Sequence, residues 1–384
     1  MRRRRPEARA PVPSSAPSRG TVPRSLPTTS PDPAAPPGST GRTAVVPAGV
    51  VLARYLNDQA SAFLRALRRR EDDEPEALLA LPRAARRIGG ALHAYQPLTD
   101  PQWASALGEE LTWLVTEVRR EQRHAARLDR LLGALRRLGG AADSELPAAG
   151  AVRAGALLDR QLTLARSRGH SAALRALGSA RFHALADAVA VLASEVPLTG
   201  SAGEPAAEVL PPLAGATRHR LDEAVRALPL ARAATAYNGE ALLAALRPAS
   251  APGPTGSAPG PAGPSTAAAD RSAPGTADGD DPWQDAVWHR VRSLALLSRC
   301  ALEVYEGASG TVEQQHLDQL AAVLGLHRDA AEAAATAAEA ARTPRIAPST
   351  AYALGVLHAD QRQEVEAARY AFSRLWQRSV PSAV

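Results

Sequence analysis

Residues 285–305 place imidazole and guanidinium groups at helical spacing. This stretch contains neither proline nor glycine, so one helix can run through all of it. At 3.6 residues per turn, one stripe of that helix carries four ionisable side chains: His289, Arg292, Arg299 and Glu303. Guanidinium groups bind oxyanions through paired N–H donors, and a protonated imidazole adds another donor. The stripe is therefore typical either of a site for a phosphate-bearing ligand or of a charged helix face in solvent.

Motifs for catalysis are scarce in this sequence. It has no Gly-x-x-x-x-Gly-Lys loop and no Gly-x-Ser-x-Gly turn, and its single cysteine, Cys300, is expected to be a small buried residue. Two Glu-x-x-His pairs, at residues 121–124 and 313–316, could form half of a di-iron site, but their polar surroundings are typical of solvated faces. We therefore expect a protein that is not an enzyme and that holds no cofactor or metal.

The positive charge of the chain is concentrated at its N-terminal end. The formal net charge is +6, and residues 1–46 account for all of it, with eight arginines and two acidic residues. The remaining residues are neutral overall, so a site for a polyanion there must be a local cluster of arginines. The run Arg2–Arg5 could act as a non-specific phosphate-binding arm or as a tail that only aids solubility.

The composition predicts a helical protein. Only 4% of the 384 residues are aromatic, so the core must be built from alanine, leucine and valine, which favours closely packed helices. A single cysteine excludes an intrachain disulfide and is compatible with a reducing compartment. No apolar run approaches the about 18 residues that a membrane-spanning helix needs. We therefore expect a cytoplasmic protein without a membrane segment.

Apolar periodicity, caps and breakers define the expected elements. Helices are predicted over residues 50–70, 76–95, 100–138, 148–194 with a break near Gly178, 211–228, 285–305, 312–342 and 348–378. Pro82 should kink the second helix or delay its start, and Pro211 with Pro212 should open the fifth. Residues 1–46 and 249–281 are low-complexity segments that we expect to be disordered.

Several short motifs, taken together, resemble the CHAD family of α-helical domains. The matching residues in the second half are His289, Arg292, Arg299 and Glu303, then Leu324-Gly325-Leu326-His327-Arg328-Asp329, then Leu354-Gly355-Val356-Leu357-His358. The matching residues in the first half are 74–77, Arg86-Arg87, 110–114 and 179–182. The resemblance covers residues 47–228 and 283–379. It is weaker in the first half, where Leu79 stands at the position of the family's histidine and Pro82 at that of an arginine.

The resemblance implies a fold of two four-helix bundles related by a pseudo-twofold axis. The first half is expected in residues 47–200 and the second in 201–379, interrupted by the insert 249–281. A constant offset of 210 residues, which pairs Leu79 with His289, agrees with a distant internal repeat.

The same resemblance implies non-enzymatic binding of inorganic polyphosphate, or of another polyanion, along helices lined by arginine and histidine. The candidate binding residues are Arg83, Arg86, Arg87, Arg218, His289, Arg292, Arg299 and His327. Alternatively, these side chains form an internal charge network, and the domain is a structural or protein–protein interaction scaffold. Sequence-specific binding of nucleic acid is not expected, because the basic segment lacks interleaved aromatic residues.

Overall fold

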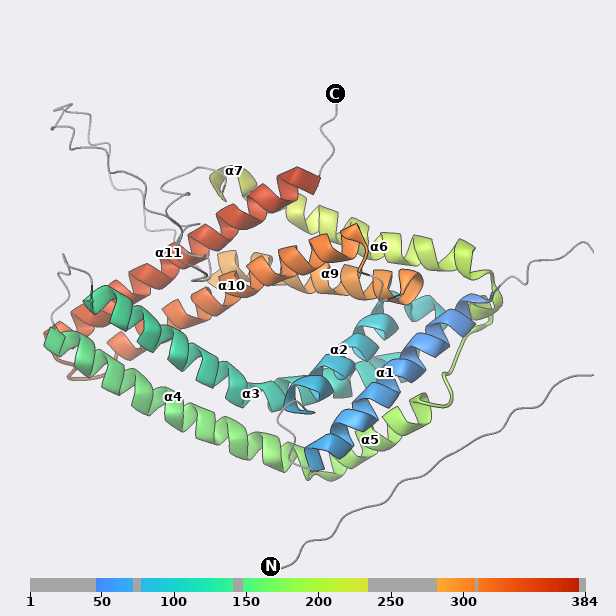
Figure 1. Cartoon of the computed structure of the whole chain (residues 1–384), viewed down its shortest axis with the longest axis horizontal. Helices are drawn as coiled ribbons and strands as arrows, with labels where there is room; N and C mark the ends of the chain where they lie inside the picture. Colours follow the sequence, from blue (N-terminus) through green and yellow to red (C-terminus); the bar gives the residue numbers. More distant parts are fainter. Residues whose placement is uncertain (1–45, 72–76, 141–147, 234–281, 308–309, 380–384) are drawn as a thin grey trace, which may run out of the picture. The chain divides into compact units, whose positions relative to one another are not determined.

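The computed structural model describes the chain from residue 46 onward with four internal gaps. The described ranges are 46–71, 77–140, 148–233, 282–307 and 310–379. The expected disordered segments therefore lie outside the described residues, apart from Val46. Within the described ranges the regular secondary structure is helical and contains no strand, which confirms the predicted all-α class (Figure 1).

The helices follow the predicted order closely. They are α1 (Ala48–Glu71), α2 (Ala77–Ala94), α3 (Pro101–Gly139), α4 (Ala148–Leu177), α5 (Ala180–Leu192), α6 (Ala206–Arg226), α7 (Leu230–Ala233), α9 (Pro282–Glu306), α10 (Val312–Ala341) and α11 (Pro348–Ser379). Two short 3₁₀ helices, Gln96–Leu98 and Gly200–Gly203, precede α3 and α6. The short helix α7 was not expected from the sequence.

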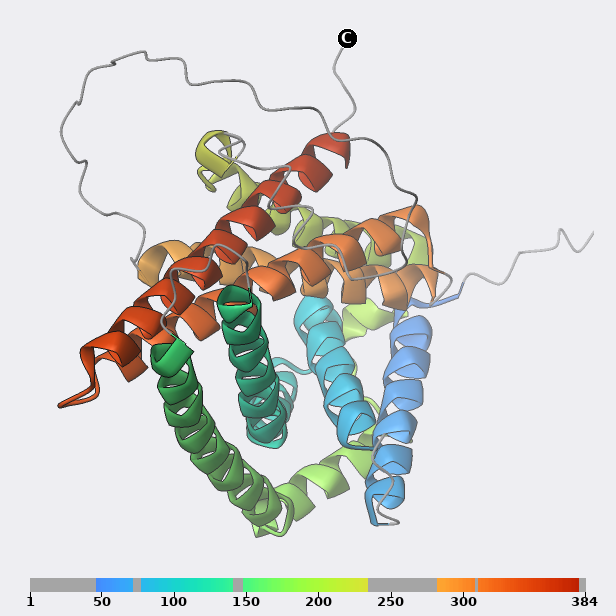
Figure 2. The same ribbon diagram turned by 60° about the vertical axis from the view of Figure 1, so that its left-hand side comes forward.

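Two sets of four helices repeat the same order of contacts. In the first set α1 packs on α2, α2 on α3 and α3 on α4, and in the second set α6 packs on α9, α9 on α10 and α10 on α11. Each helix also contacts its counterpart, since α1 meets α6, α2 meets α9, α3 meets α10 and α4 meets α11. The close pairing of α3 with α4 and of α10 with α11 is visible in both orientations (Figure 2). This arrangement is the one implied by two related four-helix bundles.

Local capping explains why several of these helices begin where they do. The side chain of Asp100 accepts a hydrogen bond from the backbone N–H of Trp103 at 2.8 Å, so α3 starts at the predicted place. Ser179 caps α5 by accepting from the N–H of Phe182 at 3.2 Å. This cap, together with Gly178, produces the predicted break between α4 and α5.

The start of α6 differs from the prediction, which placed it at Pro211. The helix begins five residues earlier, at Ala206, and both Pro211 and Pro212 lie inside it. The N–H of Ala206 donates to the carbonyl of Val46 at 2.8 Å, so a contact distant in sequence fixes this end. Pro82 likewise lies within α2, which continues through it as one element. Tertiary packing thus overrides the local preference of proline in both helices.

Apolar packing is divided among three main clusters of buried side chains. The first joins α1, α2, α5 and the N-terminal part of α3 with the C-terminal part of α9. The second joins the C-terminal parts of α3 and α10 with α4 and α11, and the third joins α6 and α7 with the N-terminal parts of α9 and α10 and the C-terminal part of α11. Helices α3, α9, α10 and α11 are therefore each anchored in different clusters near their two ends, whereas α1 and α2 lie along the first cluster.

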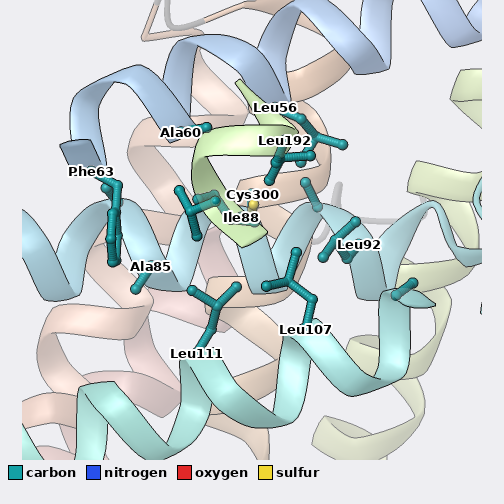
Figure 3. Close-up of a cluster of buried hydrophobic side chains, with 14 of the residues drawn as sticks. Leu56, Ala60, Phe63, Ala85, Ile88, Leu92, Leu107, Leu111, Leu192 and Cys300 are labelled. Atoms are coloured by element: carbon teal, nitrogen blue, oxygen red, sulfur yellow. The ribbon is translucent and has the colours of Figure 1, made fainter. Parts of the chain in front are cut away.

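Cys300 of α9 reaches into the first of these clusters (Figure 3). A Cβ atom at Gly90 of α2 would lie 2.9 Å from the Cys300 Sγ atom, so the two helices approach closely there. The thiol donates to the carbonyl of Arg87 at 3.4 Å, and its sulfur lies 3.8 Å from the hydroxyl of Tyr55. Burial raises the pKa of this thiol to about 12.

Replacing Gly150 by alanine should destabilise the fold at the contact between α4 and α11. The added Cβ would clash with the carbonyl oxygen of Ser349 and lie 2.9 Å from its carbonyl carbon, and backbone atoms cannot move away cheaply. We expect the free energy of unfolding to fall by about 1–3 kcal/mol in urea denaturation followed by circular dichroism. Gly155→Ala in the same helix is the control, because its Cβ would make an ordinary 3.6 Å contact with Leu132. An equal effect of both substitutions would contradict this packing.

Candidate functional site

The middle of α3, between the first and second apolar clusters, is polar. No hydrophobic side chain of α3 is fully buried between Val118 and Leu131. Helices α2, α3, α10 and α9 contact one another in a closed cycle around this region. The charged side chains of these four helices therefore come close together there.

Six arginines form what we call the guanidinium cluster. They are Arg83 and Arg86 of α2, Arg119 and Arg123 of α3, Arg292 of α9 and Arg328 of α10. Loss of solvent between the helices, followed by repulsion from Arg119 and Arg292, lowers the pKa of Arg86 to about 10. Loss of solvent and then the charge of Arg328 also lower the pKa of Arg119 and of Arg292. These guanidinium groups are thus close enough to repel one another.

Five of the six members have no acidic partner in the described part of the chain. Among the described residues, no carboxylate lies within ion-pair distance of Arg83, Arg86, Arg119, Arg123 or Arg292, and only Arg328 is paired. In addition, the Nε atom of Arg292 is buried without a hydrogen-bond acceptor in the described part of the chain. A buried donor that is left unpaired costs free energy, and so does uncompensated positive charge. The cluster therefore has the character of a site that an anion would complete.

Two histidines border the guanidinium cluster, His289 on α9 and His124 on α3. The Nε2 atom of His289 and the Nδ1 atom of His124 are buried and have no hydrogen-bond partner within the described ranges. Burial, and then nearby arginines, lower the pKa of His124. Burial also lowers the pKa of His289, although the charge of Asp285 acts in the opposite direction. Both imidazoles are consequently neutral near pH 7 and are available as extra donors to an anion.

Comparison with known proteins identifies the family. The profile of the CHAD domain family matches residues 54–338, which include helices of both four-helix sets. The chain belongs to the CHAD domain family. It is similar to PptA from Streptomyces chartreusis, with 48% identity, a TM-score of 0.67 and coverage of 86% of this chain and 100% of that chain.

A second solved structure resembles the chain more distantly. The CHAD domain from the plant Ricinus communis has 19% identity and a TM-score of 0.47, with coverage of 85% of this chain and 93% of that chain. No curated protein matches the chain. None of the helices that the structure describes is both long and apolar enough to cross a membrane.

Two of the arginines that match the CHAD motifs lie at a carboxylate. The Nε atom of Arg87 is 3.3 Å from Oε1 of Glu303, and Arg299 pairs with Oε2 of the same residue. Arg299 also donates to Asp318 at 2.8 Å. Glu303 is buried, with a 4% exposed side chain, and it joins α2 to α9. These two arginines therefore contribute to an internal charge network, while Arg83, Arg86, His289 and Arg292 gather at the cluster.

The CHAD-motif histidine His327 belongs to a second internal network. It is fully buried, and its Nε2 atom lies 3.4 Å from Asp285 and accepts from Arg369 at 3.2 Å. Asp285 also accepts from Arg362 and Arg369, at 2.9 and 2.8 Å, so it links α9 to α11. The indole ring of Trp288 stacks on His327 with 5.6 Å between centroids. His327 is thus a buried member of the frame that positions His289, whose ring centroid is 5.7 Å away.

Arg218 lies in a different environment from the other predicted site residues. It pairs with Asp222 at 3.0 Å and Glu313 at 2.9 Å, and its guanidinium stands 5.5 Å from the ring centroid of Trp376. The sequence reasoning instead missed Arg119, Arg123 and Arg328. The polar interruption of the apolar pattern of α3 was the signal that could have identified the first two.

The two Glu-x-x-His pairs do not combine in the structure. Glu121 accepts from Arg166 and His170 of α4, while Glu313 pairs with Arg218 of α6. In the part of the chain that the structure describes, no group of three or more metal-ligating side chains could hold an ion.

Replacing Glu303 by glutamine should lower stability, because it leaves Arg87 and Arg299 without their shared carboxylate. Breaking a fully buried pair costs about 3–5 kcal/mol, and since Arg87 is partly exposed we expect about 1–3 kcal/mol here. Chemical denaturation measures the change. Asp318→Asn is the control, because it removes a 52% exposed partner of Arg299 and should cost less than about 0.5 kcal/mol. Equal losses in the two variants would argue against a buried network at Glu303.

Proposed function

We propose that this CHAD domain binds inorganic polyphosphate at the guanidinium cluster and performs no chemistry on it. The observation that carries this proposal is the convergence of six arginines from four helices. Five of these arginines lack an acidic partner among the described residues. The family membership supports the same ligand class. A cytoplasmic location remains a prediction.

The chemistry of polyphosphate suits this arrangement. The polymer presents many phosphoryl oxygens along a flexible chain and therefore needs an array of donors more than a closed pocket. Each guanidinium can bind an oxyanion through two N–H groups, and the helices hold several of them at fixed separations. Binding would also relieve the mutual repulsion of Arg86, Arg119 and Arg292. With about five phosphate contacts, the slope of log affinity against log salt should be about −4.

A scaffold role is the second candidate, and a specific observation favours it. Ion pairs connect the two four-helix sets at several places, among them Arg87–Glu303, Arg127–Glu332 and Arg130–Glu364. Such pairs fix one helix set on the other without any ligand. If this is their only role, substitutions in the guanidinium cluster will leave polyphosphate affinity unchanged, and the search must turn to protein partners.

The combined substitution of Arg86 and Arg292 by glutamine should remove polyphosphate binding. Each substitution removes one charge-assisted contact to the ligand. We expect the two substitutions together to lower the affinity for long-chain polyphosphate by roughly 100-fold or more. Titration of the full-length protein at low and moderate salt measures it. Stability should not fall, because neither side chain has an acidic partner among the described residues and their mutual repulsion disappears.

Two controls accompany this double variant. Arg218→Gln removes an arginine that pairs with Asp222 and Glu313, so it should leave the affinity unchanged. A protein in which Arg2–Arg5 are replaced by serine tests the N-terminal arm. Normal binding by a folded double variant, with loss only in the arm variant, would place the site in the N-terminal segment and sink the assignment to the cluster.

Affinity for polyphosphate should increase as the pH falls from 8 to about 5.5. His289 faces Asp285 on its own helix and Arg328 and Glu332 on α10, and burial keeps its pKa below 6.5 in the free protein. Bound phosphates would raise that pKa, so binding takes up a proton, and the gain disappears as the pH rises through the pKa of the complex. We expect roughly a 3- to 10-fold change by calorimetry across this range.

Substitution of the bordering histidines should flatten this profile. His289→Gln together with His124→Gln removes both groups, so affinity should then vary little between pH 8 and 5.5. His219→Gln is the control, because His219 is exposed on α6 and pairs with Glu223. An unchanged pH profile in the double histidine variant would show that other groups take up the proton.

A further inference from the structure

One carboxylate, Glu332 of α10, lies among the charges of the guanidinium cluster. It pairs with Arg127 of α3, and its Oε1 atom is 3.9 Å from the Nε atom of Arg328. Its charge also acts on Arg292 and on both bordering histidines, whose pKa values it raises against the larger effect of burial. A single side chain thus acts on arginines and imidazoles contributed by α3, α9 and α10.

The spacing of charges on α10 differs in one respect from that on α3, its counterpart. Helix α3 presents Arg119 and Arg123 one turn apart, whereas α10 presents Arg328 and, one turn later, Glu332. By the offset of 210 residues, Glu332 corresponds to Gln122 of α3, so α10 carries a carboxylate where its counterpart carries a neutral amide. The side chain of Glu332 keeps 31% of its surface exposed, so a ligand entering the cluster would meet it directly.

We propose that Glu332 is an internal competitor of the polyphosphate ligand and limits its affinity. This inference rests on the proposed function of the cluster. In the free protein the carboxylate compensates part of the positive charge and holds the guanidinium of Arg127. When polyphosphate binds, its phosphoryl oxygens replace Glu332 as the acceptors of Arg127 and Arg328. The carboxylate of Glu332 then lies near negatively charged phosphates that repel it. The free energy of binding is therefore reduced by the cost of breaking the ion pairs that Glu332 makes in the free protein.

If Glu332 has this role, removing its ion pair with Arg127 should increase the affinity for polyphosphate. Glu332→Gln keeps the size and shape of the side chain but removes its charge. Affinity for long-chain inorganic polyphosphate should rise roughly 3- to 10-fold at low ionic strength, and the difference should shrink as salt screens it. The slope of log affinity against log salt should also become steeper by about 0.7–0.9, because one more guanidinium is free for a phosphate.

Glu364→Gln is the matched control. Glu364 pairs with Arg130 and Arg137, farther along the same helix α3, and it is not among the charges that shift Arg86, Arg119 or Arg292. Glu364→Gln therefore removes an equivalent ion pair between the two helix sets without changing the charges around the guanidinium cluster. We expect its affinity to stay within about 2-fold of wild type, since its charge is screened over that separation.

A second variant keeps the proposal testable if Glu332→Gln does not fold. Asp329→Asn removes the exposed carboxylate that holds Arg328 and that also acts on Arg119 and Arg292. It should tighten binding in the same direction by a smaller factor. Unchanged or weaker binding in a folded Glu332→Gln protein would overturn the inference while leaving the proposed function intact. No binding by wild type or by any variant would overturn the proposed function and the inference with it.

Discussion

Repulsion among the arginines of the guanidinium cluster is the constraint that the rest of the structure must balance. Positive side chains from α2, α3, α9 and α10 are held near one another, and loss of solvent, followed by their mutual repulsion, lowers the pKa of Arg86 to about 10. The three apolar clusters supply the opposing force, because α2 lies along the first of them and α3, α9 and α10 are each anchored in two of them. Separating the arginines would require these anchors to be pulled apart. The apolar packing therefore holds together like charges whose repulsion the proposed anionic ligand would reduce.

Carboxylates divide the arginines of the body into two classes. Glu303 and Asp285 each hold two or more cationic partners across different helices, and these partners are part of the frame. The arginines of the cluster are held by neither of these two carboxylates. Neighbouring residues can fall in different classes, since Arg86 faces other arginines while Arg87 faces Glu303. The neutral charge balance of the body is thus compatible with a local excess, because the pairing is uneven.

Much of the fold could be predicted from the sequence, and the reasons are local. Asp100 followed by proline defined the start of α3, apolar periodicity with caps and breakers defined the order of the helices, and the family resemblance implied their arrangement in two bundles. The start of α6 could not be predicted, because a backbone hydrogen bond to Val46, distant in the sequence, fixes it. The site could be predicted only in part, because it also depends on contacts that are distant in the sequence. A stripe on one helix shows which side chains share a face, but only the contacts between helices decide that Arg292 meets Arg119 while Arg87 meets Glu303.

The approach of α2 and α9 at Gly90 also determines how the protein behaves toward thiol chemistry. Cys300 is enclosed between these helices and α1, and its raised pKa keeps the sulfur protonated and unreactive. Movement of α9 away from α2 would expose it to an alkylating reagent, and the same movement would separate Arg86 from Arg292. The cysteine is therefore an intrinsic probe of how the interface between the two helix sets opens. The rate at which it is modified would report how often the cluster comes apart and whether a bound anion slows that motion.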